Sequence, residues 1–164
     1  MILEAILALA GTAAIASIIN LFDKKKEVKP IYMKAQLPGD LPVIALSNNG
    51  KMLNFLLDSG SNISHICEDC YESLESDLIG TFEENSVEGL GATNMGVTMC
   101  KAILSDNIGN KYNVNFSISK QLVDVAKTIE ASTNVRIHGL LGTDFLKKYN
   151  YVIDFNSLKV YPNK

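Results

Sequence analysis

An apolar run that ends in an acidic residue is the feature that most constrains this chain. Residues 55–57 (Phe-Leu-Leu) lead directly into Asp58, and Ser-Gly-Ser-Asn follows at 59–62. A continuous apolar run of this kind indicates a buried strand, and a glycine among small polar residues favours a tight turn. A carboxylate at the end of a buried strand lies where its charge is costly. The stretch therefore predicts an acid at the tip of a hydrophobic strand, which suits general acid or base chemistry.

Length and composition indicate one globular domain with a short appendage. The chain has 164 residues, of which 47% are hydrophobic and 20% are charged, so it can bury a real core. The formal net charge is only −3, which gives no indication of a nucleic-acid partner.

The three cysteines predict neither a complete disulfide framework nor a complete metal site. Their number is odd, which excludes full pairing. Cys67 and Cys70 form a C-x-x-C motif, and Cys100 lies far away. A structural zinc ion normally needs four ligands; His65 and His138 could add to the set, but there is no second paired motif. We expect reduced thiols with no metal and no cofactor, and keep zinc or redox chemistry at the C-x-x-C as the alternative.

The N-terminal segment is long and apolar enough to span a membrane. Residues 2–22 contain a single charge, Glu4, and about 20 apolar residues suffice for a spanning helix. Lysines at 24–26 favour a cytoplasmic location for the residues that follow. The alternative is an amphipathic or buried helix of a soluble protein. We expect a single-pass membrane protein with three parts: an anchor at 1–23, a linker at 24–34 and a cytoplasmic domain at 35–164.

The rest of the chain predicts short strands with few helices. Asn-Asn-Gly at 48–50 is a strong hairpin turn signal between two strands, and the second of these strands ends at Asp58. There is no alternation of strands with long helices, so we expect an all-β, closed barrel-like domain with one or two short helices. The expected strands are 31–36, 41–47, 51–57, 63–66, 97–104, 112–118, one that begins at 135–137, 151–155 and 158–161. The expected helices are 68–79 and 120–130, the second capped by Ser119, and a helical turn reaches Tyr149.

A glycine-rich stretch at 86–96 lies between β-prone segments. It is either a simple hairpin loop or a mobile hairpin whose backbone can approach a ligand. It lacks the Lys-Ser/Thr of a phosphate-binding loop and the βαβ context of a dinucleotide site.

Two distant stretches, LLDSGSN at 56–62 and GLLGTDFL at 139–146, together resemble the retropepsin-like aspartic proteases. In that family an apolar strand leads into Asp-Thr/Ser-Gly, and a glycine-bearing flap hairpin follows. Later, two apolar residues and a glycine precede a short helix that often carries Asp or Asn near its start. The resemblance covers about 31–161 and implies the closed barrel of that family. The N-terminal anchor is similar to that of membrane-attached bacterial members.

The resemblance implies an aspartic endopeptidase that acts on protein or peptide substrates. Two Asp side chains then share one water, and one carboxyl is protonated while the other is ionised. The chain has one Asp-Ser-Gly motif, and Asp144 and Asp154 fit the catalytic pattern less well. The resemblance therefore implies a homodimer in which each copy supplies Asp58. The alternative is a catalytically silent peptide-binding or assembly domain with the same barrel.

The resemblance also implies roles for the residues around Asp58. Ser59 would bond across the dimer, and Gly60 would leave room for the substrate backbone. Further substrate contacts would come from Asn62 and from the flap residues Gly89, Leu90 and Gly91. Gly142 and Asp144 would support the active-site loop.

Overall fold

The computed structural model describes residues 30–33, 41–82 and 96–163. The predicted membrane segment at 2–22 and the flap residues Gly89, Leu90 and Gly91 lie outside these ranges, so the expectations for them stay predictions. Within the described ranges, no helix is both long and apolar enough to cross a membrane.

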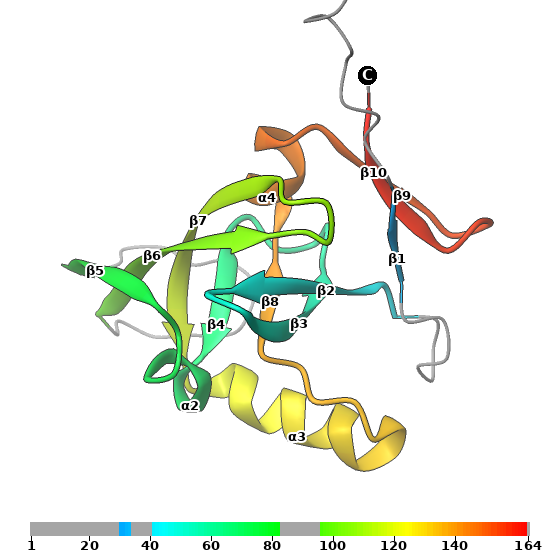
Figure 1. The fold of residues 1–164 in the computed structure, drawn as a ribbon. Coiled ribbons are helices and arrows are strands. Elements are labelled where there is room, and N and C mark those ends of the chain that lie inside the picture. The colour runs from blue at the N-terminus through cyan, green and yellow to red at the C-terminus, as the bar shows by residue number, and fades with distance from the viewer. Residues whose placement is uncertain (1–29, 34–40, 83–95, 164) are drawn as a thin grey trace, which may run out of the picture.

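The described residues are mostly β-structure, with three short helices (Figure 1). The strands are β1 (Ile31–Tyr32), β2 (Val43–Asn48), β3 (Lys51–Leu57), β4 (Ser64–Cys67), β5 (Ser76–Phe82), β6 (Val97–Ser105), β7 (Lys111–Ser119), β8 (Gly139–Leu141), β9 (Tyr151–Asp154) and β10 (Lys159–Pro162). The helices are α2 (Glu68–Tyr71), α3 (Gln121–Thr133) and α4 (Thr143–Lys148).

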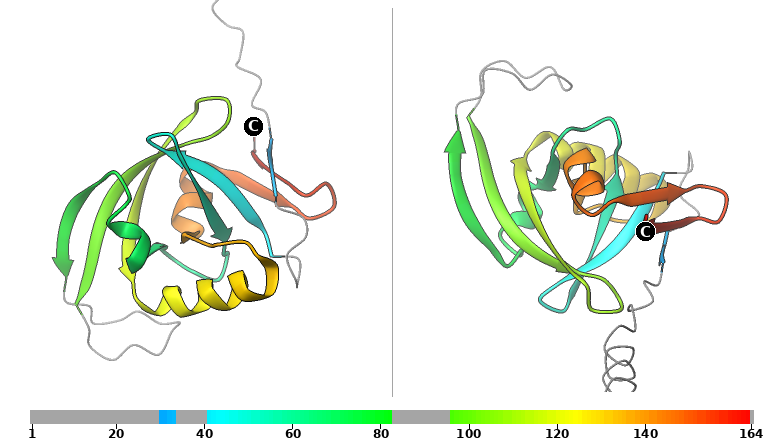
Figure 2. Two further views of the ribbon diagram at one scale, coloured as in Figure 1. Left: turned by 60° about the horizontal axis from the view of Figure 1, so that its bottom comes forward. Right: turned by 90° about the horizontal axis from the view of Figure 1, so that it is seen from above.

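Six strands close into a barrel, which confirms the mostly-β closed barrel that we expected. Their order is β2-β3-β8-β4-β7-β6, and a pairing of Ser47 on β2 with Ser105 on β6 completes the ring. Among the described strands, β5 pairs only with β6 and forms an outer edge. The described part of the chain has three short helices where we expected one or two and a helical turn. Figure 2 shows α3 running along one rim of the barrel.

The β2–β3 hairpin forms as its turn residues predict. Asn49 has φ 45° and Gly50 has φ 82°, the positive values that such turns require. Alternate residues of β3 point into the core, and Leu53, Phe55 and Leu57 are at most 3% exposed. Burial of this face fixes the register of β3, so the strand ends where Asp58 begins.

The short strand β8 lies between β3 and β4. It runs parallel to β3 and antiparallel to β4, so three segments far apart in sequence meet there. All three residues of β8 are buried. A Cβ on Gly139 would lie 2.6 Å from the carbonyl oxygen of His65, so the close approach of β8 to β4 requires glycine.

A separate three-stranded sheet in the order β1-β10-β9 projects from the side of the barrel (Figure 2). Ile31 on β1 pairs with Val160 on β10, and both side chains are buried. Ile31 falls within the range assigned above to the linker at 24–34, so this part of the range takes part in the folded sheet.

The predicted helix at 68–79 is wrong beyond its first turn. α2 ends at Tyr71, and residues from Ser76 onward form β5 instead. The Asn48 side chain accepts the Glu75 N–H at 2.8 Å and donates to the Glu75 carbonyl at 3.1 Å, which holds the chain extended before β5. Gly80, the residue directly after the predicted helix, has φ 147° at an irregularity in the β5–β6 ladder.

The expectation for 135–137 also needs correction, because the strand begins only at Gly139. The preceding helix α3 is confirmed and extends to Thr133, with Asn134 in the left-handed conformation (φ 57°) at its end. The Ser119 hydroxyl accepts the Leu122 N–H at 3.2 Å, as a capping serine should.

Candidate active site

Asp58 follows β3 at the point where this strand runs beside β8. Its N–H donates to the Leu141 carbonyl at 3.0 Å, which continues the β3–β8 ladder by one residue. Because β8 also pairs with β4, the connection from β3 to β4 must turn around the end of β8. Asp58 thus lies in a loop whose two ends are fixed by the same buried strand.

The Asp58 carboxylate is oriented by the backbone of its own turn. Its Oδ1 accepts the Gly60 N–H at 2.8 Å, and its carbonyl accepts the Ser61 N–H at 3.3 Å. A Cβ on Gly60 would lie 3.1 Å from Oδ1, so a side chain there would crowd the carboxylate. Within the described residues, Oδ2 has no hydrogen bond, which leaves one oxygen of a half-buried acid available for chemistry.

The loop after Asp58 rests on the start of α4. The Thr143 N–H donates to the Ser61 carbonyl at 2.8 Å. A Cβ on Gly142 would lie 2.6 Å from the Ile63 carbonyl oxygen and 2.8 Å from that of Ser61. These are backbone atoms that cannot rotate away, so the loop and α4 meet this closely only because residue 142 is glycine.

Ser64 connects β4 to the start of α4, a role that its sequence context did not predict. Its side chain is fully buried; Oγ accepts the Gly142 N–H at 3.1 Å and donates to Asp144 Oδ1 at 2.8 Å. Asp144 therefore makes the structural hydrogen bond expected of it at a helix start. The only sequence signal for Ser64 was a small polar residue within the expected short strand at 63–66.

The remaining candidates lie on the same loop or outside the described residues. Ser59 and Asn62 are exposed, and neither side chain makes a hydrogen bond within the described parts of the chain. The structure thus brings Asp58, Gly60, Gly142 and Asp144 together, with Ser59 and Asn62 at the surface beside them.

Comparison with solved structures decides the fold. A retropepsin-like aspartic protease from Rickettsia conorii matches with a TM-score of 0.53 at 15% identity, over 82% of this chain and 91% of that one. This chain has the retropepsin-like fold. EIAV protease complexed with the inhibitor HBY-793 matches with a TM-score of 0.46 at 17% identity, over 68% of this chain and 89% of that one. No family model matches the chain, and neither does any curated protein.

In this retropepsin-like fold, the other two candidate acids, Asp144 and Asp154, make structural hydrogen bonds. Asp154 ends β9 and accepts hydrogen bonds from Asn156 N–H at 2.9 Å and from Ser157 N–H at 3.1 Å. The Ser157 hydroxyl also donates to it, and these bonds lower the pKa of Asp154, which is a turn residue. Asp144 is bonded to Ser64, so the loop proposed as the candidate active site carries Asp58 alone of these three acids.

Burial disfavours the charged form of both histidines. His65 pairs with Leu140 across β4 and β8, and its Nδ1 is buried without a hydrogen bond in the described structure. Burial lowers the pKa of His65, and Asp144 and Asp58 oppose that shift. His138 Nδ1 accepts the Asn54 N–H at 3.0 Å, and burial lowers its pKa too. The retropepsin-like fold thus uses His138 structurally and places His65 near the candidate active site.

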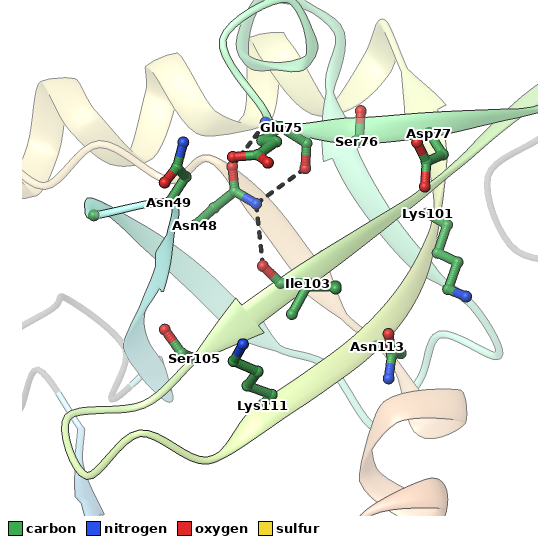
Figure 3. A pocket seen from close by; sticks show the side chains of 11 residues that line it. Asn48, Asn49, Glu75, Ser76, Asp77, Lys101, Ile103, Ser105, Lys111 and Asn113 are labelled. Carbon is green, nitrogen blue, oxygen red and sulfur yellow. Dashed lines mark hydrogen bonds between the residues drawn. The ribbon is translucent and has the colours of Figure 1, made fainter.

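A pocket of about 420 Å³ lies away from this site, beside the β2–β3 turn (Figure 3). The Asn48 side chain lies between Glu75 and Ile103 and donates to both of their carbonyls at 3.1 Å. This turn precedes β3, whereas Asp58 follows that strand, so the pocket and the acid are at opposite ends of it.

Proposed function

We propose that this chain is an aspartic endopeptidase that acts as a homodimer, with one Asp58 from each copy. The observation that carries the proposal is the position of Asp58 in a retropepsin-like fold, in the sequence Asp-Ser-Gly and with Oδ1 bonded to the Gly60 N–H. Fold alone does not imply function. Support comes from three features that occur together: the acid Asp58, the Asp-Ser-Gly turn, and the loop from β3 to β4 that passes around the end of β8.

The proposed reaction uses two carboxyl groups that share one water. Two carboxyl groups that share one water are too close for both to ionise easily, so one Asp58 is protonated and the other is ionised. The ionised group takes a proton from the water as its oxygen attacks the peptide carbonyl. The protonated group donates to the carbonyl oxygen, and a later proton transfer to the leaving nitrogen completes hydrolysis. The pair titrates as a unit.

A dimer is proposed because each chain supplies one such acid. Asp144 and Asp154 are both engaged in structural hydrogen bonds. A second Asp58 related by a two-fold axis would complete the pair. The Ser59 hydroxyl, exposed at the tip of the loop, would then bond across the axis and fix the two loops against each other.

The other predicted residues have proposed supporting roles. Gly142 and Asp144 would hold the loop in place through their contacts with 61–64. Gly60 and Asn62 would contact the substrate backbone. Gly89, Leu90 and Gly91 would belong to a flap that closes over the substrate and excludes water.

We also propose that residues 2–22 anchor the protein in a membrane as a single pass, with the protease domain in the cytoplasm. The support is the apolar sequence followed by three lysines. Alkaline extraction of cell membranes should leave the full chain in the pellet and release a chain that begins at Lys24. In intact cells the domain should be protected from added protease. Release of the full chain by alkali would refute the anchor.

The experiment that tests the proposed activity compares wild type with Asp58→Asn on a broad peptide library at several acidic pH values. Asparagine keeps the shape of the side chain but cannot act as the acid or base, so cleavage should fall by at least about 10³-fold. Thermal unfolding of both proteins shows whether the fold is preserved. If neither protein cleaves any peptide but both bind peptides equally, the chain is the silent binding domain instead.

A further inference from the structure

A pair of thiols lies at the junction of β4 and α2, outside the candidate active site. Cys67 is the last residue of β4 and is fully buried, and Cys70 in α2 is 5% exposed. Their sulfur atoms and a carboxylate oxygen of Asp69 all lie within 4.8 Å of one another. The third cysteine, Cys100, is buried in β6, and β7 lies between that strand and β4 in the sheet.

Arg136 closes the surface side of this group. Its Nη2 donates to Asp69 Oδ2 at 2.7 Å and to Cys70 Sγ at 3.8 Å. The side chains of Arg136 and Asp69 are each 38% exposed, so Cys70 is covered by two side chains that reach solvent. Cys67 has no such route, because its thiol points to the Ile137 carbonyl in the interior at 3.8 Å.

This arrangement disfavours a metal ion. The group offers three ligand atoms where a structural zinc site normally has four. The guanidinium of Arg136 already supplies a positive charge to the carboxylate and to one of the sulfurs. A second cation would have to displace that ion pair. The same positive charge instead favours a thiolate at Cys70, against Asp69, whose Oδ1 accepts a hydrogen bond from the Cys70 thiol at 3.4 Å.

The two thiols are electrostatically unequal. Hydrogen bonding with Cys67 and with Arg136 lowers the pKa of the Cys70 thiol, against the opposing effects of burial and Asp69. Hydrogen bonding to Cys70 and burial raise the pKa of the Cys67 thiol. Cys70, with the lowered pKa, is only 5% exposed but lies on the surface side of the fully buried Cys67. A thiol of lowered pKa on the surface side of a second thiol is the arrangement of an attacking cysteine and a resolving cysteine.

We propose that Cys67 and Cys70 form a redox-active dithiol site that takes small-molecule disulfides as its oxidants. The Cys70 thiolate attacks one sulfur of the small disulfide; a sulfur–sulfur bond forms to Cys70, and the first small thiolate departs. The Cys67 sulfur then attacks the Cys70 sulfur, the second small thiolate departs, and the proton of Cys67 passes to it. The cysteine pair loses two electrons and the small disulfide gains them. Rotation of the side chains brings the sulfur atoms to the bonding distance of about 2.05 Å.

The test treats the folded full chain with hydroxyethyl disulfide, a small neutral probe, at pH 7. After acid quenching and alkylation, peptide mass spectrometry should find a disulfide between Cys67 and Cys70, with Cys100 still alkylated as a free thiol. Cys100 serves as an internal control for unfolding. If all three cysteines lose their free thiols at one common rate, the reaction proceeds through unfolding and the proposal is overturned.

Two single variants test the order of attack. Cys67→Ser should accumulate a stable mixed disulfide on Cys70, because the resolving thiol is gone. Cys70→Ser should leave Cys67 unmodified, because that thiol is buried. The proposal would be overturned if Cys67 were modified in Cys70→Ser while Cys70 stayed unmodified in Cys67→Ser. The wild-type mapping decides the matter if either variant fails to fold.

Arg136→Gln tests the source of the reactivity. The variant removes the positive charge beside Cys70, so the pKa of that thiol should rise. A rise of about one unit reduces the thiolate fraction but increases the nucleophilicity of the thiolate, so attack on the small disulfide should slow by about threefold. Lys120→Gln is the matched control, since Lys120 pairs with Glu68 at 3.4 Å and is not among the hydrogen-bond partners of either thiol in the described structure. It should leave the rate unchanged. Stoichiometric binding of added zinc that protects both thiols from alkylation would show a metal site and overturn the dithiol proposal.

Discussion

Ser64 Oγ donates a 2.8 Å hydrogen bond to Asp144 Oδ1 across 80 positions of sequence. The same oxygen accepts the Gly142 N–H, so one fully buried hydroxyl joins β4 to the start of α4. The loop that carries Asp58 lies directly before β4 and rests on α4 through the bond from Thr143 to Ser61. The position of the candidate catalytic acid therefore depends on a contact that does not touch it.

Ser64→Ala should destabilise the fold by about 2–3 kcal/mol, because the Gly142 N–H and one Asp144 oxygen lose their bond in a buried site. Urea unfolding of a fragment that begins at Lys24 would measure this as a lower midpoint with an unchanged slope. Ser132→Ala is the matched control. Ser132 is exposed on α3, so its effect should stay within about 0.5 kcal/mol. Equal effects of the two changes would contradict the assigned role of Ser64.

Gly142→Ala should be at least as damaging as the loss of Ser64. The new methyl group would lie within 2.8 Å of two backbone carbonyl oxygens of the loop that carries Asp58, and these cannot move without shifting Asp58. We expect a loss of about 3 kcal/mol and reduced peptide cleavage by the folded fraction. Gly96→Ala is the control, since its nearest neighbour is the Thr81 methyl group at 3.2 Å, the end of a side chain. A well-folded and fully active Gly142→Ala protein would show that the loop tolerates displacement.

The two histidines should make the fold less stable in mild acid. Burial lowers the pKa of both, and Arg136 and Lys51 lower that of His138 further, so the folded state binds fewer protons than the unfolded state near pH 6. The free energy of unfolding should therefore be largest above pH 6.5 and decline as the pH falls below this value. Asp69 and Asp154 do not interfere, because their ordinary pKa is 3.8 and the fold lowers it.

Urea unfolding at pH 5.0 and pH 7.5 measures this effect, and a variant with both His65→Gln and His138→Gln supplies the comparison. The variant should lose much less stability between the two pH values than wild type does. An equal loss in both proteins would assign the acid sensitivity to other groups.

Asp106→Ala should weaken the join between the barrel and the projecting sheet. This buried carboxylate accepts the Tyr112 hydroxyl at 2.7 Å, and Tyr112 in turn is hydrogen-bonded to Tyr151 on β9. Asp106 also accepts both the N–H and the side-chain amide of Asn110, at 2.9 and 2.8 Å. Loss of the Asp106 carboxylate should lower the free energy of unfolding, measured in urea, by about 3 kcal/mol. Asp124→Ala, on the exposed face of α3, should change stability little, and a comparable loss there would contradict this role.

The sequence was sufficient to predict the elements that depend on local patterns. Asn49 and Gly50 specify their turn, and the apolar run before Asp58 specifies a buried strand that ends at the acid. The Leu-Leu-Gly element was identified through its resemblance to a family, although its three-residue strand and its place between β3 and β4 follow from pairing with distant segments. No local pattern encodes that pairing.

The failures arose where distant contacts decide local structure. Tyr71, Leu74 and Leu78 have helical spacing, yet Leu78 lies on β5 and is 62% exposed. Pairing with β6 and the side chain of Asn48 override the local pattern there. Ser64 was missed for the same reason, since its partners on α4 lie about 80 residues later.

The most direct test of the central claim, that each Asp58 is half of an active site, mixes wild type with Asp58→Asn at a constant total concentration and measures peptide cleavage. If dimers form at random, an equal mixture contains about one quarter wild-type dimers, so activity should fall to about a quarter of that of wild type alone. A fall to about a half would mean that each chain acts by itself, and undiminished activity would mean that Asp58 is not catalytic.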